Sequence, residues 1–239
     1  MRLSHYIQST LAPHLSLKQI KKAIEENSCK VNGRRERFAS YLVRQNDRVE
    51  FEQRKAQEIE ILYEDQDLAV VHKPPFIVCE AKKGLLGYRL AHRLDKETSG
   101  CLLLAKTAEM EEALAELFRK REVEKEYLAV VKGRPRPSGV IDKPIGGQSA
   151  KTAYRLEKKG KNISLIRCFP ETGRTHQIRI HLASIGHPIL GETKYGRSDT
   201  VVSRILLHSA KIGFVHPRTH RWLSVEAPLP KEFYEAFNR

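Results

Sequence analysis

The stretch with the clearest chemical potential is a polar loop, His92–Gly100, that contains the carboxylate Asp95 and leads directly into the apolar run Cys101–Ala105. An apolar run of that length is typical of a buried strand. A carboxylate at the edge of a core is costly unless a cation pairs with it, so we expect Arg93 or a basic residue from elsewhere beside Asp95. A purely structural ion pair would explain this local pattern equally well.

Two later segments add candidate residues. Tyr127 begins the run Tyr127–Val131, which is apolar on both faces and is therefore predicted to be an inner strand. The segment Arg174–Leu182 is rich in Arg and His and has the apolar spacing of a helix. By their local context alone, Tyr127 would be a core residue and Arg179 a solvated helix residue.

Several familiar sites are excluded by spacing. The chain has no Gly-x-x-x-x-Gly-Lys phosphate loop and no Gly-x-Ser-x-Gly elbow. His176 and His181 are five residues apart without an acidic residue between them, which is not the His-Glu-x-x-His spacing of zinc enzymes. The four cysteines form no Cys-x-x-Cys pair, and we interpret them as ordinary thiols of a reducing compartment.

The charge indicates a polyanionic partner. The 239 residues include 43 Lys and Arg against 29 Asp and Glu, which gives a net charge of +14. A protein this basic usually binds nucleic acid, with an anionic membrane surface as the rival partner. No apolar run approaches the roughly 20 residues of a membrane span, and the N-terminus opens no signal-peptide pattern. We expect a cytoplasmic protein, a monomer, without a membrane partner.

Composition and periodicity divide the chain into two parts. Residues 1–53 are predicted to form a small α+β domain, residues 54–58 a polar linker, and residues 59–239 the larger domain. In the larger part many predicted strands accompany few helices, and one β-α-β unit is evident, which indicates an α+β fold with a mixed, largely antiparallel sheet. The helix expected after Thr107 has acidic residues in its first turns and basic residues at its end, as the helix dipole favours.

The first part is basic on both its second helix and the following turn. Such a surface is suited to phosphate contacts, although a solvated charged face is the common alternative. The segments Leu17–Ile24, Lys30–Gly33 and Asp47–Glu50 resemble the alpha-L RNA-binding module of the ribosomal-protein S-four type. The residues expected to contact RNA are Lys18, Lys21, Lys22, Arg34, Arg35 and Arg37.

The larger part resembles the RluA family of large-ribosomal-subunit and tRNA pseudouridine synthases, in order and from about residue 59 to the C-terminus. The motifs that carry the resemblance are Ile61–Asp65, Val70–Pro74, His92–Gly100, Glu124–Tyr127, Gly173–Leu182, Gly186–Gly191 and Leu207–Ala210. The segment Pro75–Ala81 departs from the family pattern, and the stretch between it and the Asp95 loop is short.

The resemblance implies isomerisation of a uridine already in RNA, without a cofactor or a metal. It implies the pseudouridine synthase fold, with Asp95 as the essential carboxylate, Arg179 as its cationic partner and Tyr127 packed on the uracil. Ile178 would press on the other side of the base, and Arg93 would fill the gap left by the flipped nucleotide. Lys73 and His176 belong to the same matching motifs and are expected to bind the substrate.

Three functions remain for comparison. The first is an RNA pseudouridine synthase, acting on large-subunit rRNA or alternatively on tRNA. The second is a catalytically silent RNA-binding assembly factor of the same fold, against which Asp95, Tyr127 and Arg179 argue. The third is an Asp-dependent hydrolase of an anionic substrate, which no motif supports.

Overall fold

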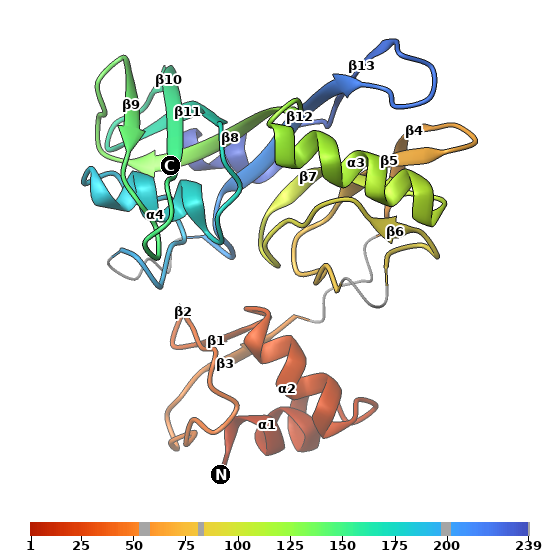
Figure 1. The fold of residues 1–239 in the computed structure, drawn as a ribbon. Helices are drawn as coiled ribbons and strands as arrows, with labels where there is room; N and C mark the ends of the chain where they lie inside the picture. The colour runs from red at the N-terminus through yellow and green to blue at the C-terminus, as the bar shows by residue number, and fades with distance from the viewer. Residues whose placement is uncertain (53–57, 81–83, 197–201, 239) are drawn as a thin grey trace. The chain divides into compact units, whose positions relative to one another are not determined.

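The chain forms two compact units in the computed structural model, Met1–Gln57 and Glu58–Arg239. The structure describes residues 1–52, 58–80, 84–196 and 202–238 (Figure 1). Most of the predicted linker, residues 54–57, lies outside the described residues, as does Ala81 of the divergent segment.

The N-terminal unit packs helices against a small antiparallel sheet of strand order β2-β1-β3. Its core is made of aliphatic side chains from both layers, such as Leu3, Ile20, Ile24 and Val31. The elements are α1 (Leu3–Tyr6), the π-helical segment η1 (Ile7–Leu11), α2 (Leu17–Glu25), β1 (Cys29–Val31), β2 (Arg34–Arg35) and β3 (Val49–Phe51).

Helix α2 begins where the sequence predicts. The Ser16 hydroxyl accepts a hydrogen bond from the Gln19 backbone N–H at 3.3 Å, and the Gln19 side chain accepts one from the Ser16 N–H at 2.9 Å. This reciprocal capping box satisfies N–H groups that the first turn of a helix leaves without partners. Ile20 and Ile24 lie on the buried face, so the lysines of the same helix face solvent.

The larger unit is built on one mixed sheet that contains ten strands within the described residues. The main path runs β4-β5-β7-β12-β8-β11-β10-β9, with β13 paired to β12 and β6 paired to β7. The strands are β4 (Glu60–Glu64), β5 (Leu68–Lys73), β6 (Arg89–Leu90), β7 (Ser99–Ala105), β8 (Glu124–Lys132), β9 (Ser138–Asp142), β10 (Lys151–Lys159), β11 (Ile163–Pro170), β12 (Leu207–Val215) and β13 (Trp222–Glu226).

The sheet is largely antiparallel, as predicted, and its one parallel pair in the described structure is β7 with β12. The prediction of a β-α-β unit, which would lie around residues 101–131, is wrong, because β7 and β8 are neither adjacent nor parallel. Strand β12, from near the C-terminus, inserts between β7 and β8 and is parallel to the first but antiparallel to the second. The inner position predicted for Tyr127–Val131 is confirmed, because β8 lies between β12 and β11.

Two longer helices pack against the sheet. Helix α3 (Ala108–Lys120) lies along the β7 and β12 region, and α4 (Gln177–Ser184) lies beside β9–β11 (Figure 1). The Thr107 hydroxyl caps α3 by accepting from the Met110 N–H at 3.1 Å. Met110 and Leu114 then pack in one hydrophobic core, while Leu182 of α4 packs in a second one. A short helix, α5 (Lys231–Glu235), and the 3-10 segment η2 (Ala236–Asn238) follow β13.

Sequence patterns missed two short edge elements. Strand β6 has only two residues, and β9 alternates between exposed and buried residues next to Gly- and Pro-rich segments. Neither contains the apolar run that marks an inner strand. Among the described residues, no helix is long and apolar enough to cross a membrane.

Gly100 marks a close approach of β7 to β12. Its φ is +111°, and a Cβ atom there would lie 2.1 Å from the Ser209 carbonyl oxygen. The parallel pair that places Ser99 and Gly100 beside His208 and Ser209 therefore requires a glycine at this position.

We expect Gly100→Ala to lower the free energy of unfolding by about 3 kcal/mol or more, because backbone strain and a backbone clash add. The matched control is Gly147→Ala, where φ is +76° and nothing lies within 4 Å of the added Cβ. That change should cost only about 1–2 kcal/mol. Urea denaturation measures both, and equal losses would contradict a close approach at Gly100.

Candidate active site

One cavity in the larger unit gathers six of the seven residues predicted for chemistry and substrate binding. It has a volume of about 530 Å³ and opens between the Asp95 loop, the start of β8 and the start of α4. The six predicted residues in its lining are Arg93, Asp95, Tyr127, His176, Ile178 and Arg179.

Asp95 is held at the cavity by its loop. Leu94 is 5% exposed and packs in a hydrophobic core with Val71 and Leu102, which anchors the loop beside Asp95. Thr98 donates its N–H to the Asp95 carbonyl oxygen at 3.1 Å, which closes a turn. At the start of the loop the neutral ring of His92 accepts from the Leu103 N–H at 3.0 Å, since burial lowers the pKa of His92 to about 3. The side chain of Asp95 is 22% exposed.

Arg179 is the cation beside Asp95. Its Nη1 donates to Asp95 Oδ2 at 3.3 Å. The other side of the guanidinium donates twice to Glu192, from Nε at 2.7 Å and from Nη2 at 3.0 Å. Glu192 is 1% exposed, and although burial opposes ionisation, Arg179 and two backbone N–H groups hold its pKa below the usual value. Glu192 therefore fixes the guanidinium, which presents its remaining edge to Asp95.

Arg93 is not the partner of Asp95. It is exposed and lies on the cavity wall, which leaves its guanidinium open to a substrate.

His176 lies on the other side of Asp95. Its Nε2 is 3.7 Å from Asp95 Oδ1, and its Nδ1 is 2.8 Å from the Tyr195 hydroxyl. Burial lowers the pKa of His176 although Asp95 opposes the shift, so the ring is neutral at neutral pH. The Arg179 guanidinium also lies over the Tyr195 ring, with its Cζ 5.4 Å from the ring centroid.

Tyr127 and Ile178 line the cavity from different elements. Tyr127 pairs with Ser209 across β8 and β12, and Ile178 lies in the first turn of α4. Burial raises the pKa of Tyr127 to about 12, and the negative charge of Asp95 adds to the shift. At neutral pH the phenol is protonated, so it can donate a hydrogen bond but is not a ready base.

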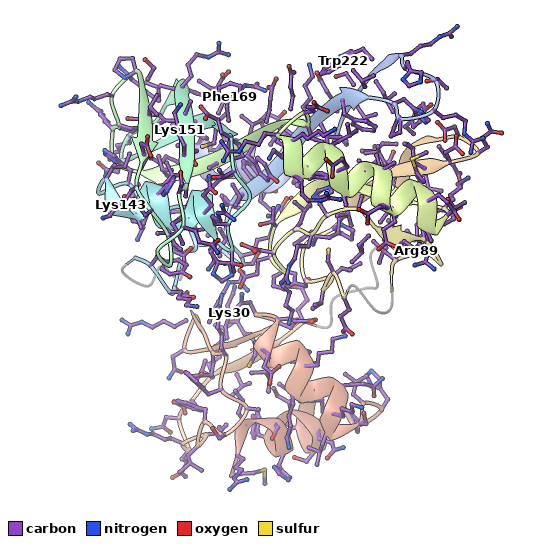
Figure 2. All side chains as sticks on the ribbon, viewed as in Figure 1. Lys30, Arg89, Lys143, Lys151, Phe169 and Trp222 are labelled. Carbon is purple, nitrogen blue, oxygen red and sulfur yellow. The ribbon has the colours of Figure 1, made fainter. Side chains whose placement is uncertain are left out.

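Helix α4 is fixed to the sheet by buried polar contacts. The Gln177 amide donates to the Lys151 carbonyl and the Thr152 hydroxyl, both at 3.0 Å. His181 contacts the same hydroxyl at 2.9 Å and the Lys143 carbonyl at 2.9 Å. Lys143 and Lys151 are labelled in Figure 2 on the β9–β10 side of this unit.

Lys73 lies outside the cavity lining. It is fully buried, and its ammonium donates to the carbonyl oxygens of Pro74, Ile77 and Lys96 at 2.9, 3.1 and 3.3 Å. Burial lowers its pKa to about 8. Because Lys96 follows Asp95 directly, the contact with its carbonyl oxygen holds the Asp95 loop in place. We assign Lys73 a positioning role in place of the substrate contact expected from the sequence.

The basic residues predicted for RNA contact in the N-terminal unit differ in availability. Lys18, Lys21, Lys22 and Arg34 are exposed. Arg35 donates to the Asn27 carbonyl at 2.6 Å, and Arg37 donates to the Asn27 side chain at 2.6 Å. These last two arginines therefore also stabilise the unit itself.

Glu192, Gln177 and Tyr195 were missed as site residues. Gln177 lies inside one of the family motifs and Glu192 follows Gly191 at the end of another, so a signal was present in the sequence. An acidic residue after a glycine turn is normally solvated, and only the fold shows that Glu192 is buried against Arg179.

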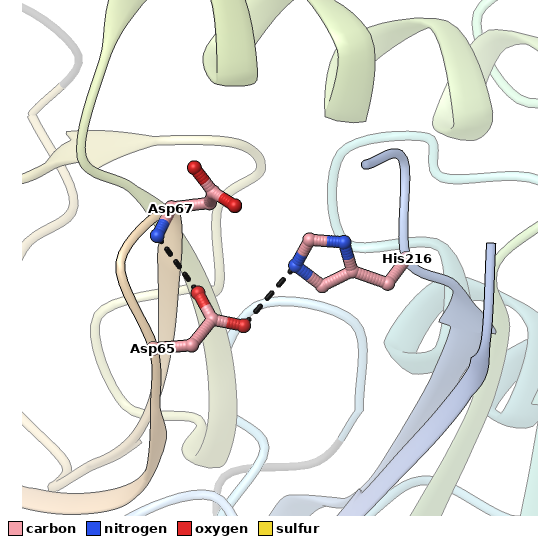
Figure 3. Close-up of side chains that lie close together, drawn as sticks. All are labelled: Asp65, Asp67 and His216. Carbon is pink, nitrogen blue, oxygen red and sulfur yellow. Dashed lines mark hydrogen bonds and ion pairs between the residues drawn. The ribbon is translucent and has the colours of Figure 1, made fainter. Parts of the chain in front are cut away.

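A cluster of Asp65, Asp67 and His216 lies outside the cavity and has the residue types of a metal site (Figure 3). The His216 Nδ1 accepts from the N–H groups of Arg218 and Thr219, at 3.1 and 3.2 Å. The ring proton is therefore on Nε2, which donates to Asp65 Oδ2 at 3.1 Å. Both ring nitrogens are engaged, and Arg218 pairs with Asp67. We conclude that the cluster joins the β4–β5 turn to the β12–β13 turn.

Comparison with known proteins agrees with the family resemblance of the sequence motifs. Residues 67–184 match the family model described as RNA pseudouridylate synthase. The chain is 36% identical over 222 residues to ribosomal large subunit pseudouridine synthase D of Nitrosomonas europaea, an alignment that spans 75% of this chain and 64% of that relative. An uncharacterized RNA pseudouridine synthase of Helicobacter pylori is 34% identical over 236 residues, which cover 92% of this chain and 94% of the relative.

A solved structure agrees. Human RNA pseudouridylate synthase domain containing 4 superposes with a TM-score of 0.64 at 25% identity, over 75% of this chain and 92% of the human one. This likeness confirms the predicted pseudouridine synthase fold with its mixed, largely antiparallel sheet, while the alpha-L module expected at the N-terminus stays a prediction. From its near full-length relative and its matching family model, the chain belongs to the RNA pseudouridylate synthases, the isomerases that convert uridine to pseudouridine in RNA.

Proposed function

We propose that the chain isomerises one or more uridines of large-subunit ribosomal RNA. The observation that carries the proposal is the placement of Asp95, Arg179, Tyr127 and Ile178 around one cavity. The relative from Nitrosomonas europaea is named for the same substrate. The net charge of +14 supports binding to a long polyanion. The same chemistry on tRNA is the alternative that the mapping experiment below would reveal.

The proposed reaction begins with a flipped nucleotide, because a uridine in folded RNA is stacked and an enzyme cannot reach its glycosidic bond there. Tyr127 and Ile178 would hold the uracil, and the ionised Asp95 would act as nucleophile or base at the ribose. The bond from N1 to C1′ breaks, the uracil turns, and C5 bonds to C1′. The proton lost from C5 is balanced by the one gained at N1, so no co-reactant is required.

Arg179 supports this role of Asp95. An adjacent cation favours the ionised form of a carboxylate at neutral pH. Because Arg179 is already fixed by Glu192, its charge is in position before the substrate arrives. The guanidinium therefore needs no reorganisation as charge develops at the ribose.

For the N-terminal unit we propose an RNA-holding role. The exposed residues Lys18, Lys21, Lys22 and Arg34 would contact phosphates while the larger unit reaches one uridine. This division of labour suits a large structured RNA. We further propose a cytoplasmic, monomeric enzyme without metal or cofactor, and its four buried free thiols are suited to a reducing compartment.

The proposal is tested by Asp95→Asn. Wild-type protein should form pseudouridine in an unmodified large-subunit rRNA transcript without any cofactor. We expect the variant to lose at least about 10²–10⁴-fold in turnover, as removal of a reacting carboxylate does. Binding should survive, because phosphate contacts supply most of the affinity.

The control makes the same chemical change at the exposed residue Asp142 and should leave turnover intact. Mapping of pseudouridines in total RNA from cells with and without the protein identifies the site. Near wild-type turnover by Asp95→Asn would contradict the role of Asp95 as the reacting carboxylate. Pseudouridine that depends on the protein in tRNA alone would show that the substrate is tRNA and not rRNA.

The pH dependence tests how Tyr127 acts. Because burial raises its pKa to about 12, the phenol stays protonated from pH 7 to 9 and kcat should not rise through this group. We expect Tyr127→Phe to retain about tenfold more activity than Tyr127→Leu, since stacking of a base on an aromatic ring is worth roughly 1–3 kcal/mol. A tenfold increase in wild-type kcat per pH unit, abolished in Tyr127→Phe, would instead show that the phenolate is the reacting base.

Charge removal tests the N-terminal unit. Lys18, Lys21 and Lys22 are replaced together by Gln. The slope of log binding constant against log salt concentration should then become shallower by roughly 0.7–0.9 for each phosphate that the variant no longer neutralises. The kcat should be unchanged. The control removes three exposed charges elsewhere, at Lys158, Lys159 and Lys161. An unchanged slope in the first variant would mean that α2 does not touch RNA.

A further inference from the structure

One part of the cavity wall carries two cations that the reaction described above does not use. Arg121 and Lys125 both line the cavity. In the described part of the chain neither forms an ion pair with a carboxylate, whereas their neighbours do. Arg119 pairs with Glu112 and Glu116.

The strand geometry relates these cations to Tyr127. Successive side chains of a strand point to opposite faces, so Lys125 and Tyr127 of β8 share the face that lines the cavity. Glu126, on the other face, pairs with Arg167 at 2.6 Å. Lys125 is therefore the next side chain along the cavity wall from the tyrosine expected to hold the uracil.

The arrangement is costly without an anion. Burial lowers the pKa of Lys125, and the charge of Arg121 lowers it further. Arg121 itself ends α3 in the left-handed conformation, with φ of +62°, where glycine is the usual residue. A helix dipole favours cations after α3, but it does not explain Lys125, which lies in a strand. Arg121 is exposed and Lys125 is half-buried, so the cavity wall carries two like charges that an anion would balance.

We propose that Arg121 and Lys125 form a phosphate subsite that binds the RNA backbone next to the uridine in the cavity. The inference rests on the proposed function for the identity of that anion. A flipped nucleotide keeps its two flanking phosphates, which must stay at the cavity when the base enters. The guanidinium of Arg121 can donate two parallel hydrogen bonds to a phosphate, and the ammonium of Lys125 can donate one more to the same group.

The first test measures binding of the full-length protein to an unmodified large-subunit rRNA transcript over a range of salt concentrations. We expect Lys125→Met and Arg121→Gly each to weaken binding about tenfold, the typical effect of a charge-assisted hydrogen bond. The salt slope should fall by roughly 0.7 for the one phosphate. The double variant should show little further change in slope beyond either single one, because both residues bind the same phosphate.

The variants are chosen to keep the fold. Met is an unbranched side chain of similar length to Lys125, and it can keep the contact with the Phe118 ring, over which the Lys125 Nζ lies at 5.9 Å from the centroid. Glycine suits the left-handed backbone at residue 121, so Arg121→Gly should unfold at the same or a higher urea concentration than the wild type. The control Lys120→Gln removes one equal charge next to Arg121, from an exposed residue that pairs with Glu116 and does not line the cavity. Its affinity and slope should match the wild type.

A second test locates the phosphate. Synthetic RNA fragments around the modified uridine, each with a single uncharged methylphosphonate linkage, should include one that wild-type protein binds about tenfold more weakly. Lys125→Met should not discriminate against that fragment. Equal reductions in affinity for wild type and variant at every linkage would overturn the subsite.

The two proposals fail separately. If Lys125→Met and Arg121→Gly bind the transcript with wild-type affinity and slope while pseudouridine still forms, the subsite is wrong and the proposed function stands. If the slope changes as expected but no pseudouridine appears, the subsite stands as an RNA contact and the proposed function fails.

Discussion

The interaction on which the site depends is the sharing of one guanidinium between two carboxylates. Arg179 donates twice to Glu192 and once to Asp95. Glu192 is almost fully buried, where an unpaired charge would be very costly, so its pairing determines where the arginine lies. Asp95 is only partly enclosed and receives the remaining edge of the guanidinium. The Arg179–Glu192 pair is buried, whereas the Arg179–Asp95 pair is only partly buried and lies at the cavity.

This arrangement requires three distant segments to meet. The Asp95 loop precedes β7, Arg179 is on α4, and Glu192 follows the turn after that helix. The insertion of β12 between β7 and β8 brings the Asp95 loop near Tyr127, because β12 pairs with Gly100 on one side and with Tyr127 on the other. The absence of a side chain at Gly100 therefore affects the placement of Asp95 relative to Tyr127 as well as stability.

Charge is balanced differently inside the cavity and along its wall. Asp95 is paired with Arg179, and the histidine and tyrosine beside it are neutral because burial shifts their pKa values away from the charged form. Along the wall, Arg121 and Lys125 lie close together without a carboxylate partner in the described structure. The paired charges around Asp95 suit an uncharged uracil, and the unpaired positive charges of the wall suit the phosphates of an RNA.

The sequence by itself determined the α+β class, the inner strand at Tyr127 and the importance of Asp95, Tyr127 and Arg179 as candidates. Strand and helix periodicities depend only on neighbouring residues, and motifs can be identified in the sequence without knowledge of the fold. From the local pattern alone the partner of Asp95 stayed open, because Arg93 is near in sequence and Arg179 is 84 residues away, and only the family resemblance named Arg179. Spatial proximity at that separation depends on the strand order, which local patterns do not encode.

Only the tertiary structure decided that Lys73 holds the Asp95 loop in place and that Glu192 is a buried partner of Arg179. Both side chains are charged, and charged residues are exposed by default, so sequence reasoning places them in solvent or on the substrate. Their burial is tolerated because the fold supplies three carbonyl oxygens to one and a guanidinium to the other. Such compensation is a property of packed segments, and a linear sequence does not contain it.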